Sequence, residues 1–433
     1  MKTPLPSGWK ECTLGSLFKV KHGYAFDGKF FAAEGDYILL TPGNFFDQGG
    51  FKLKDKEKFF IGDIPSDYVL NKGDLIVAMT EQAEGLLGSS AIIPSSNRFL
   101  HNQRLGLISD WHPDEIDICF LYFLFNTQSV RQQIRAAATG TKVRHTSPTR
   151  IGDVKVRIPS VATQRKIAGI LSAYSDLIKN NTRRVAILEE MAQAIYREWF
   201  VHFRFPGHEN AKFVDSPLGR IPEGWRIATL DEVCVEIIDS EHKTAPLQDE
   251  GFPSIRTPNI GRGHLLLENV RRVSESTYEK WTRRAIPQTG DLILAREAPV
   301  GNVAIIPERE TVCLGQRTVL IRANADLMNP HYLLRTLLDD RCQSVFSGAS
   351  SGATVAHLNL RDIRTLKIVV ASSEVLMHTA SLLEPLHQQI ANSLLRNRKL
   401  RNSLDLLLPK LISGQLDVET LDIDIGESLE VAA

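Results

Sequence analysis

The sequence contains few cysteines, and their spacing argues against a disulfide framework or a zinc knuckle. Its 433 residues include five cysteines, which are scattered and never spaced as CxxC. Disulfide-rich domains and zinc sites both need paired or closely spaced thiols. We therefore expect the five side chains to be buried free thiols.

Long apolar runs and an N-terminal signal are also missing. No stretch of about 18 apolar residues is present, which is the length that a membrane-spanning helix needs. The sequence therefore predicts a cytoplasmic protein without a membrane segment.

The known catalytic motifs are missing as well. The chain has no GxxxxGK[ST] phosphate loop, no HExxH and no nucleophile elbow, and the glycines at 261 and 263 lack the third glycine of a dinucleotide loop. His145 and His357 have no acidic or histidine neighbours at ligand spacing, which favours a structural or nucleic-acid-contacting role over a metal site. We expect no catalytic, cofactor or metal site, and hence no enzymatic activity, in this chain.

The net charge neither requires nor excludes a nucleic-acid partner, because 51 basic residues balance 51 acidic ones. One segment departs from this balance: residues 131–166 carry nine Lys or Arg against one acid, Asp153. Such a segment either contacts DNA phosphates or is an ordinary solvated face. The second half has a weaker set of basic residues, which are Arg256, Arg262, Arg271, Arg272, Arg361, Arg364 and Lys367.

What the chain does contain is an internal repeat. LPSGWKECTL near the start matches IPEGWRIATL from Ile221, GDLIVA from Gly73 matches GDLILA from Gly290, and Gln-Arg at 103–104 matches Gln-Arg at 316–317. The closing segments from Gly140 and Gly352 also align, at offsets that drift from 217 to 212 residues. Short apolar runs predict strands, and helix-period segments predict helices at 116–138 and 330–346. Each half is therefore predicted to be a mixed α+β domain.

A long helix follows each half. Residues 161–203 and a second stretch from Thr379 to 411 carry seam residues at alternating steps of 4 and 3, as in a coiled coil. Pairing the two helices antiparallel places Asn181 opposite Asn397, where each amide can satisfy the other and fix the register. We therefore expect an antiparallel two-helix coiled coil within one chain, with a pseudo-twofold relation between the halves.

The predicted segments, in order, are a first domain at 1–158, a first helix at 159–205, a linker at 206–220, a second domain at 221–371, a second helix at 372–416 and a tail at 417–433.

The paired openings, SPLGRIPEGW from Ser216, the repeated GDL[IV] and Gln-Arg elements and the helix after each half resemble the specificity subunits of type I restriction-modification enzymes. The resemblance covers nearly the whole chain. It implies two target recognition domains, each reading one half of a bipartite asymmetric DNA site, with the coiled coil as spacer. One departure concerns the start of the second helix, which has lost the proline and glutamine that the first helix keeps as Pro159 and Gln164.

The resemblance also implies partners. One copy of a non-catalytic specificity subunit binds two adenine-specific methyltransferase subunits and endonuclease-translocase subunits, and these partners use S-adenosylmethionine, ATP and Mg. An open alternative is a two-domain scaffold that joins proteins through its coiled coil without touching DNA.

The basic and amide side chains near the repeated motifs are the candidate DNA contacts. Arg104 and Arg317 are equally well explained as structural, because their Gln-Arg pairs flank a matching strand in both halves. The candidates are Arg104, Lys142, Arg144 and His145 in the first half, and Arg256, Asn259, Arg262, Arg317 and His357 in the second.

Overall fold

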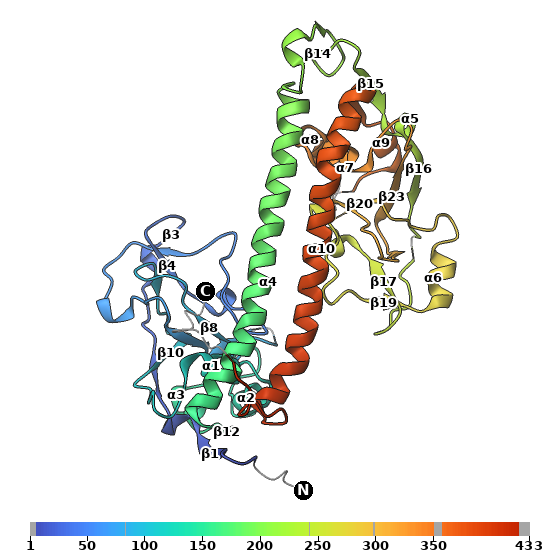
Figure 1. Cartoon of the computed structure of the whole chain (residues 1–433). Coiled ribbons are helices and arrows are strands. Elements are labelled where there is room, and N and C mark those ends of the chain that lie inside the picture. The colour runs from blue at the N-terminus through green and yellow to red at the C-terminus, as the bar shows by residue number, and fades with distance from the viewer. Residues whose placement is uncertain (1–5, 83, 242, 298, 350–356, 424–433) are drawn as a thin grey trace. The chain divides into compact units, whose positions relative to one another are not determined.

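A computed structural model describes residues 6–82, 84–241, 243–297, 299–349 and 357–423 (Figure 1). The chain folds as two compact units: unit 1 combines residues 1–179 with 399–433, and unit 2 comprises residues 180–398. Each unit therefore holds one globular domain and a share of both long helices. Among the described residues, no helix is long and apolar enough to cross a membrane.

Unit 1 is built on an antiparallel four-stranded sheet in the order β2-β10-β6-β8. Its central strand β6 is buried at every position, as expected for the apolar run after Gly73-Asp74. A second four-stranded sheet, β3-β5-β4-β9, lies in the same unit. The bounds are β1 Lys10–Thr13, β2 Lys19–His22, β3 Phe31–Ala32, β4 Tyr37–Leu39, β5 Phe59–Phe60, β6 Leu75–Ala78, β7 Thr80–Glu81, β8 Ser90–Ile92, β9 Phe99–Leu100, β10 Leu105–Ser109, α1 Ile118–Phe125, α2 Gln128–Ala136, β11 Arg144–His145, α3 Pro148–Gly152 and β12 Lys155–Ile158.

Unit 2 repeats this plan with a five-stranded sheet in the order β16-β23-β20-β21-β18. Its first four strands follow the order of the unit 1 sheet, which confirms the internal repeat. The bounds are β13 Phe213–Val214, β14 Ile221–Pro222, β15 Arg226–Thr229, α5 Leu230–Val233, β16 Cys234–Asp239, β17 Phe252–Ile255, β18 Gly263–His264, β19 Arg272–Val273, α6 Glu275–Trp281, β20 Leu292–Ala295, β21 Val303–Ile305, β22 Cys313–Leu314, β23 Thr318–Ala323, α7 Pro330–Leu338, α8 Asp340–Ala349, α9 Leu360–Arg364 and β24 Lys367–Val370. The segment 206–220, predicted to be a linker, contains β13, which pairs with β14.

The helices predicted at 116–138 and 330–346 are each broken in two, so the prediction of single helices is wrong. In unit 1 the break falls at Asn126, whose amide accepts from Ser90 N at 3.1 Å and donates to Ser90 Oγ at 2.8 Å. This amide ties the chain to β8 instead of letting the helix continue. In unit 2 the break falls at Asp339, which has an extended backbone (φ −68°, ψ 149°).

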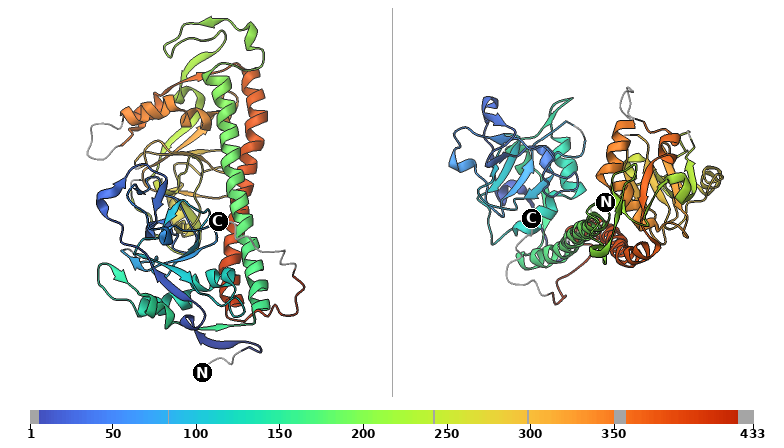
Figure 2. Two further views of the ribbon diagram at one scale, coloured as in Figure 1. Left: turned by 90° about the vertical axis from the view of Figure 1, so that its left-hand side faces the viewer. Right: turned by 90° about the horizontal axis from the view of Figure 1, so that it is seen from above.

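The long helices are α4 (Val161–Tyr196), followed by the π-helical turn η5 (Arg197–Val201), and α10 (Ser373–Ile412). They lie side by side in two views (Figures 1 and 2). In unit 1 the seam residues Ile167 and Leu171, near the start of α4, share a buried cluster with Leu411, near the end of α10. This contact makes the pair antiparallel, as predicted.

The share of the helix pair in unit 2 contains the predicted polar pair. Asn181 Nδ2 donates to Asn397 Oδ1 at 2.9 Å, and Asn397 Nδ2 donates to Thr182 Oγ1 at 3.1 Å. The first bond confirms the predicted pairing of Asn181 with Asn397, and the bond to Thr182 was not predicted. The α-helix ends at Tyr196, before the predicted residue 203, and the π turn that follows contains Phe200, which packs against Tyr332 with ring centroids 4.6 Å apart.

The two long helices begin with different contacts. The Gln164 side chain is fully buried, accepts from Asp117 N at 2.8 Å and donates to Glu115 O and Pro159 O, both at 2.9 Å. At the matching position of α10, Leu376 packs into the core of unit 2. The second helix thus replaces a hydrogen-bonded start with an apolar one.

All five cysteines are free, as predicted, but only Cys119, Cys313 and Cys342 are buried, so the prediction of burial is wrong for the partly exposed Cys12 and Cys234. Burial raises the pKa of each of these three thiols to about 12, which keeps them protonated and unreactive at neutral pH.

Candidate nucleic-acid interface

Each unit brings its three repeated motifs together at one place. In unit 1, Met79, which directly follows β6, donates its N–H to Arg104 O at 3.0 Å and accepts from Thr146 N at 2.9 Å. In unit 2, Arg296, which directly follows β20, donates its N–H to Arg317 O at 2.9 Å and accepts from Leu358 N at 3.0 Å. The residue after the GDL strand therefore joins the Gln-Arg turn to the closing segment in both copies.

We call the side chains at the unit 1 junction cluster 1: His22, Thr80, Arg104, Arg144 and His145. Strand β11 pairs with β7, so that Arg144 lies opposite Glu81 and His145 opposite Thr80. Arg104, Arg144 and His145 are exposed, and so is Lys142 nearby. Cluster 1 thus presents cationic side chains to solvent.

Glu81 is an acid that this site keeps away from solvent. Its carboxylate is buried and accepts from Gly85 N at 3.1 Å and from Leu87 N at 2.9 Å, while Arg135 lies 3.6 Å away. Glu81 therefore stabilises the loop after β7 through these hydrogen bonds, and it adds little negative charge to the exposed surface.

Cluster 2, at the unit 2 junction, comprises Asp239, Arg296, Glu297, Arg317 and His357. The Arg296 guanidinium is nearly buried; it donates to the Asp239 carboxylate, to His357 Nε2 at 2.7 Å and to Leu358 O at 2.8 Å. His357 Nδ1 lies 3.0 Å from Glu297 Oε1, and Arg317 Nε lies 2.8 Å from Glu297 Oε2. The five side chains form one continuous chain of polar contacts.

This chain of contacts assigns the tautomer of His357. A guanidinium has donors only, so the ring nitrogen that faces Arg296 must accept. The ring proton then lies on Nδ1 and is donated to Glu297. His357 is held from both sides, and both oxygens of Glu297 are used within the cluster.

Arg317 also has an unusual backbone. Its φ of +67° lies in the left-handed region, which costs a non-glycine residue about 1 kcal/mol or more. Arg256 lies beside the same turn: a Cβ added to Gly315 would lie 2.6 Å from Arg256 Cγ. Arg256 Nε is buried and has no hydrogen-bond partner among the described residues.

The structure separates two of the predicted DNA contacts from cluster 2. The Asn259 amide is used in its own turn, accepting from Arg256 N at 3.2 Å and donating to Leu266 O at 3.3 Å. Arg262 is exposed but reaches toward Leu338 O at 3.4 Å. Asn259 thus shapes the turn and Arg262 lies beside the end of α7, and DNA contact by these two residues stays a prediction.

Several members of the basic segment 131–166 are engaged within the protein, so the segment is not one continuous exposed surface, and phosphate contact by it stays a prediction. Arg131 donates to the carbonyls of Leu87, Asp47 and Gly85, and burial lowers its pKa. Other members are also engaged within the protein: Arg135 with Glu84, Arg150 with Thr139, Arg157 with Glu11, Arg165 with Asp117 and Lys166 with Glu419 O.

The sequence analysis did not single out Asp239, Arg296 or Glu297 as site residues. Arg296 and Glu297 directly follow the repeated GDLILA segment, and that position was the available signal. Asp239 and His22 occupy matching strand ends, because β16 pairs with β23 as β2 pairs with β10. Only the fold shows that these strand ends meet the Gln-Arg turn.

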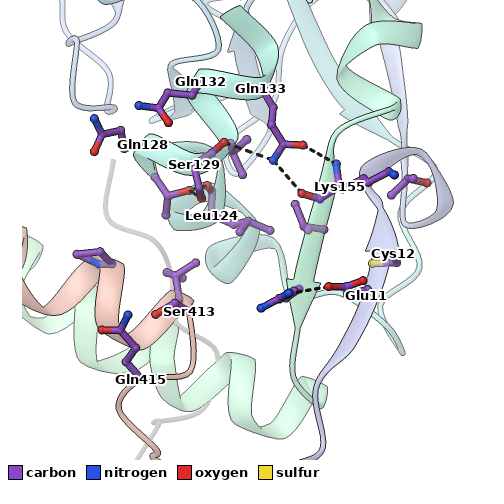
Figure 3. Close-up of a pocket in the computed structure, with 17 residues that line it drawn as sticks. Glu11, Cys12, Leu124, Gln128, Ser129, Gln132, Gln133, Lys155, Ser413 and Gln415 are labelled. Atoms are coloured by element: carbon purple, nitrogen blue, oxygen red, sulfur yellow. Dashed lines mark hydrogen bonds and ion pairs between the residues drawn. The ribbon is translucent and has the colours of Figure 1, made fainter. Parts of the chain in front are cut away.

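A hollow of about 890 Å³ in unit 1 lies apart from these residues (Figure 3). It is lined by Gln128, Ser129 and Gln132 of α2, by strands β1 and β12, and by Ser413 and Gln415 after α10. Gln133 bonds across it to the backbone of Lys155 in both directions, at 2.9 and 3.0 Å. No residue of cluster 1 lines this hollow. Among the described residues, no group of three His, Cys, Asp or Glu side chains could hold a metal ion.

Comparisons with known proteins place the chain in a family. A family model described as the type I restriction modification DNA specificity domain matches residues 6–190 and 222–400. The type I restriction enzyme MjaIX specificity subunit of Methanocaldococcus jannaschii is 26% identical over 312 residues, which are 70% of each chain. The MjaVIII specificity subunit of the same organism is 20% identical over 371 residues, 84% of each chain.

The fold agrees with this result. The crystal structure of a type I restriction-modification S subunit from M. genitalium superposes with a TM-score of 0.60 and 15% sequence identity. The match covers 95% of this chain and 98% of that one. The chain belongs to the family of type I restriction-modification DNA specificity subunits.

Proposed function

We propose that this chain selects the DNA site of a type I restriction-modification complex, with unit 1 reading one half of a bipartite asymmetric site and unit 2 the other. The observation that supports this proposal is the repeated junction, built with the same two backbone hydrogen bonds in both units but surrounded by different side chains. A shared framework with different exposed groups suits two readings of different base sequences, because base edges are distinguished by donor and acceptor patterns.

The DNA-contacting groups that we propose are basic side chains and histidines at the two junctions, of which Arg104, Lys142, Arg144, His145 and Arg317 are exposed and Arg256 and His357 are partly buried. Arg104, Lys142, Arg144 and His145 would contact one half-site. Arg256, Arg317 and His357 would contact the other. Phosphate contacts by such cations position a protein on the duplex, and a few side chains then read base edges.

We further propose that the helix pair sets the number of unread base pairs between the half-sites. The helices are 36 and 40 residues long, and the bond between Asn181 and Asn397 supports the predicted register. Inserting one heptad into both helices lengthens each by about 10 Å. Modification-sensitive genome sequencing should then show a changed gap and unchanged half-sites, whereas altered half-site bases with the original gap would refute the spacer role.

The partners that we propose are two adenine-specific methyltransferase subunits and endonuclease-translocase subunits, with one copy of this chain per complex. They would supply the chemistry of S-adenosylmethionine, ATP and Mg, and this chain would be non-catalytic. Exposed apolar side chains on the outer helix faces support docking there, because large exposed apolar groups mark interaction surfaces. They are Leu177, Ile187 and Met191 on α4 and Met377 and Leu406 on α10.

The alternative of a scaffold that does not touch DNA predicts a different binding experiment. A DNA-reading subunit mixed with its methyltransferase partner should bind duplex DNA with a log-log salt slope of several units. A scaffold should show no salt-dependent binding. The same sample measured on its modified motif and on random duplex separates specific from non-specific binding.

A further inference from the structure

Arg317 is an exposed arginine that forms an ion pair with a largely buried carboxylate. Its side chain is 61% exposed, whereas that of its partner Glu297 is 16% exposed. The contact uses Nε, 2.8 Å from Glu297 Oε2. The end of the guanidinium, where Nη1 and Nη2 each present one N–H, is a second edge that the Nε contact does not use. An arginine fixed through Nε offers a planar pair of donors with little freedom left to lose on binding.

Glu297 is itself fixed. Its other oxygen accepts from His357 Nδ1 at 3.0 Å, and His357 Nε2 accepts from Arg296 Nη2 at 2.7 Å. Arg296 is in turn anchored to the Asp239 carboxylate and to Leu358 O. Arg317 is therefore the exposed end of a network whose other members are mostly buried, which is how a reading side chain is pre-organised.

We infer that Arg317 reads a guanine in the half-site of unit 2, and that Glu297 positions it. This inference rests on the proposed function and names the base that this side chain selects. Guanine presents two adjacent acceptors, O6 and N7, in the major groove, and these match two parallel guanidinium donors. Adenine presents a donor beside N7, which a group with donors only cannot satisfy.

Unit 1 lacks this arrangement at the matching positions. Thr80 stands where unit 2 has Glu297, and Met79 stands where it has Arg296. Arg104, the match of Arg317, therefore has no carboxylate at that position. The dependence on a fixed arginine is specific to unit 2, so the half-site of unit 1 serves as an internal control.

The test uses the full chain in complex with its methyltransferase partner and duplexes that carry its modified motif. Each guanine of the motif is replaced in turn by 7-deazaguanine, which removes the N7 acceptor, or by inosine, which keeps N7 and O6. At one position, 7-deazaguanine should weaken wild-type binding about tenfold to hundredfold, whereas inosine should not. R317A should bind the natural and the 7-deaza duplex equally, and R104A should keep the wild-type difference.

E297Q tests the positioning role by a ratio of affinities. Removing the negative charge should leave binding to random duplex unchanged or stronger, while preference for the natural guanine over 7-deazaguanine falls. A folding defect would weaken both. The inference is overturned if wild type tolerates every 7-deaza substitution or if R317A keeps the sensitivity. If no duplex binds better than random DNA, the proposed function fails as well.

Discussion

Clusters 1 and 2 have the same backbone hydrogen bonds at their junctions but differ in the polar contacts that their side chains make. In cluster 2, Arg296 and Glu297 neutralise and orient their neighbours, so Arg317 emerges from a network of charge pairs. In cluster 1 the matching positions are Met79 and Thr80, and the exposed cations stand beside an acid, Glu81, that is turned to its own loop. The comparison shows that the same backbone framework carries different exposed side chains in the two units.

Replacing Arg296 by the residue that unit 1 uses gives the largest expected effect. R296M removes a nearly buried guanidinium from the Asp239 carboxylate and should lower the free energy of unfolding of unit 2 by about 3–5 kcal/mol. D239H/R296M, which installs both unit 1 residues, should recover part of the loss. Urea unfolding with pulse proteolysis, with fragments assigned to each unit, measures this. Equal stability of R296M and wild type would show that the network does not stabilise unit 2.

The second-largest expected effect is that lowering the pH destabilises unit 2 more than unit 1. In unit 2, burial lowers the pKa of His331 to about 4 and that of His387 to about 2, and their rings stack 4.8 Å apart. In unit 1, burial lowers the pKa of His101 to about 4.

These histidines are neutral when folded and bind protons once unfolded, below their ordinary pKa of about 6.5. The stabilisation is present above pH 6.5 and is lost as pH falls, by about 2 kcal/mol per histidine at pH 5. Unit 2 should therefore lose roughly twice as much stability as unit 1. H387Q should reduce the difference, and equal acid sensitivity of both units would contradict the assignment of these buried neutral rings.

Changes in the helix pair should alter the free energy of unfolding by a smaller amount. The part of the pair in unit 2 is aligned by a polar pair, whereas the part in unit 1 is aligned by apolar contacts. N181L removes the hydrogen bond from Asn181 Nδ2 to the buried Asn397 Oδ1 and should cost about 1–3 kcal/mol. N181L/N397L should be nearly neutral in stability. Cysteines at 181 and 397 should cross-link, and preferred linking one heptad away would refute this register.

The smallest effect on stability should come from the exposed cations of unit 1. K142A/R144A should change the free energy of unfolding by less than about 0.5 kcal/mol, because both side chains are exposed. It should reduce the salt slope of DNA binding by about 2 units. R131A is the matched control from the same basic segment. R131A should destabilise unit 1, because the Arg131 guanidinium donates to three backbone carbonyls. If R131A lost as much salt slope as K142A/R144A, phosphate contact by the whole segment 131–166 would be favoured instead.

Much of this architecture is predictable from sequence because it is periodic. The heptad steps placed Asn181 opposite Asn397, and the repeated GDL and Gln-Arg elements located the two junctions. These features depend on spacing, which a sequence displays directly.

The site itself was less predictable, because its key contacts join strand ends that are distant in sequence. Asp239 and Arg296 differ in type from His22 and Met79 at the matching positions, so the repeat marked the position after GDLILA but did not indicate which residue types form the site. The Asn259 amide is used by its own turn, and Arg131 is used by neighbouring carbonyls. Residue type suggested DNA contact for both, but only tertiary contacts show which polar groups are already satisfied.

Methylated-site sequencing of cells that carry the wild-type, R104A or R317A chain tests the central claim, which is that the two junctions read different half-sites. We predict that R104A relaxes a base preference in one half-site and R317A in the other, with the gap between them unchanged. Relaxation of the same half-site by both variants, or an unaltered motif in both, would contradict the account.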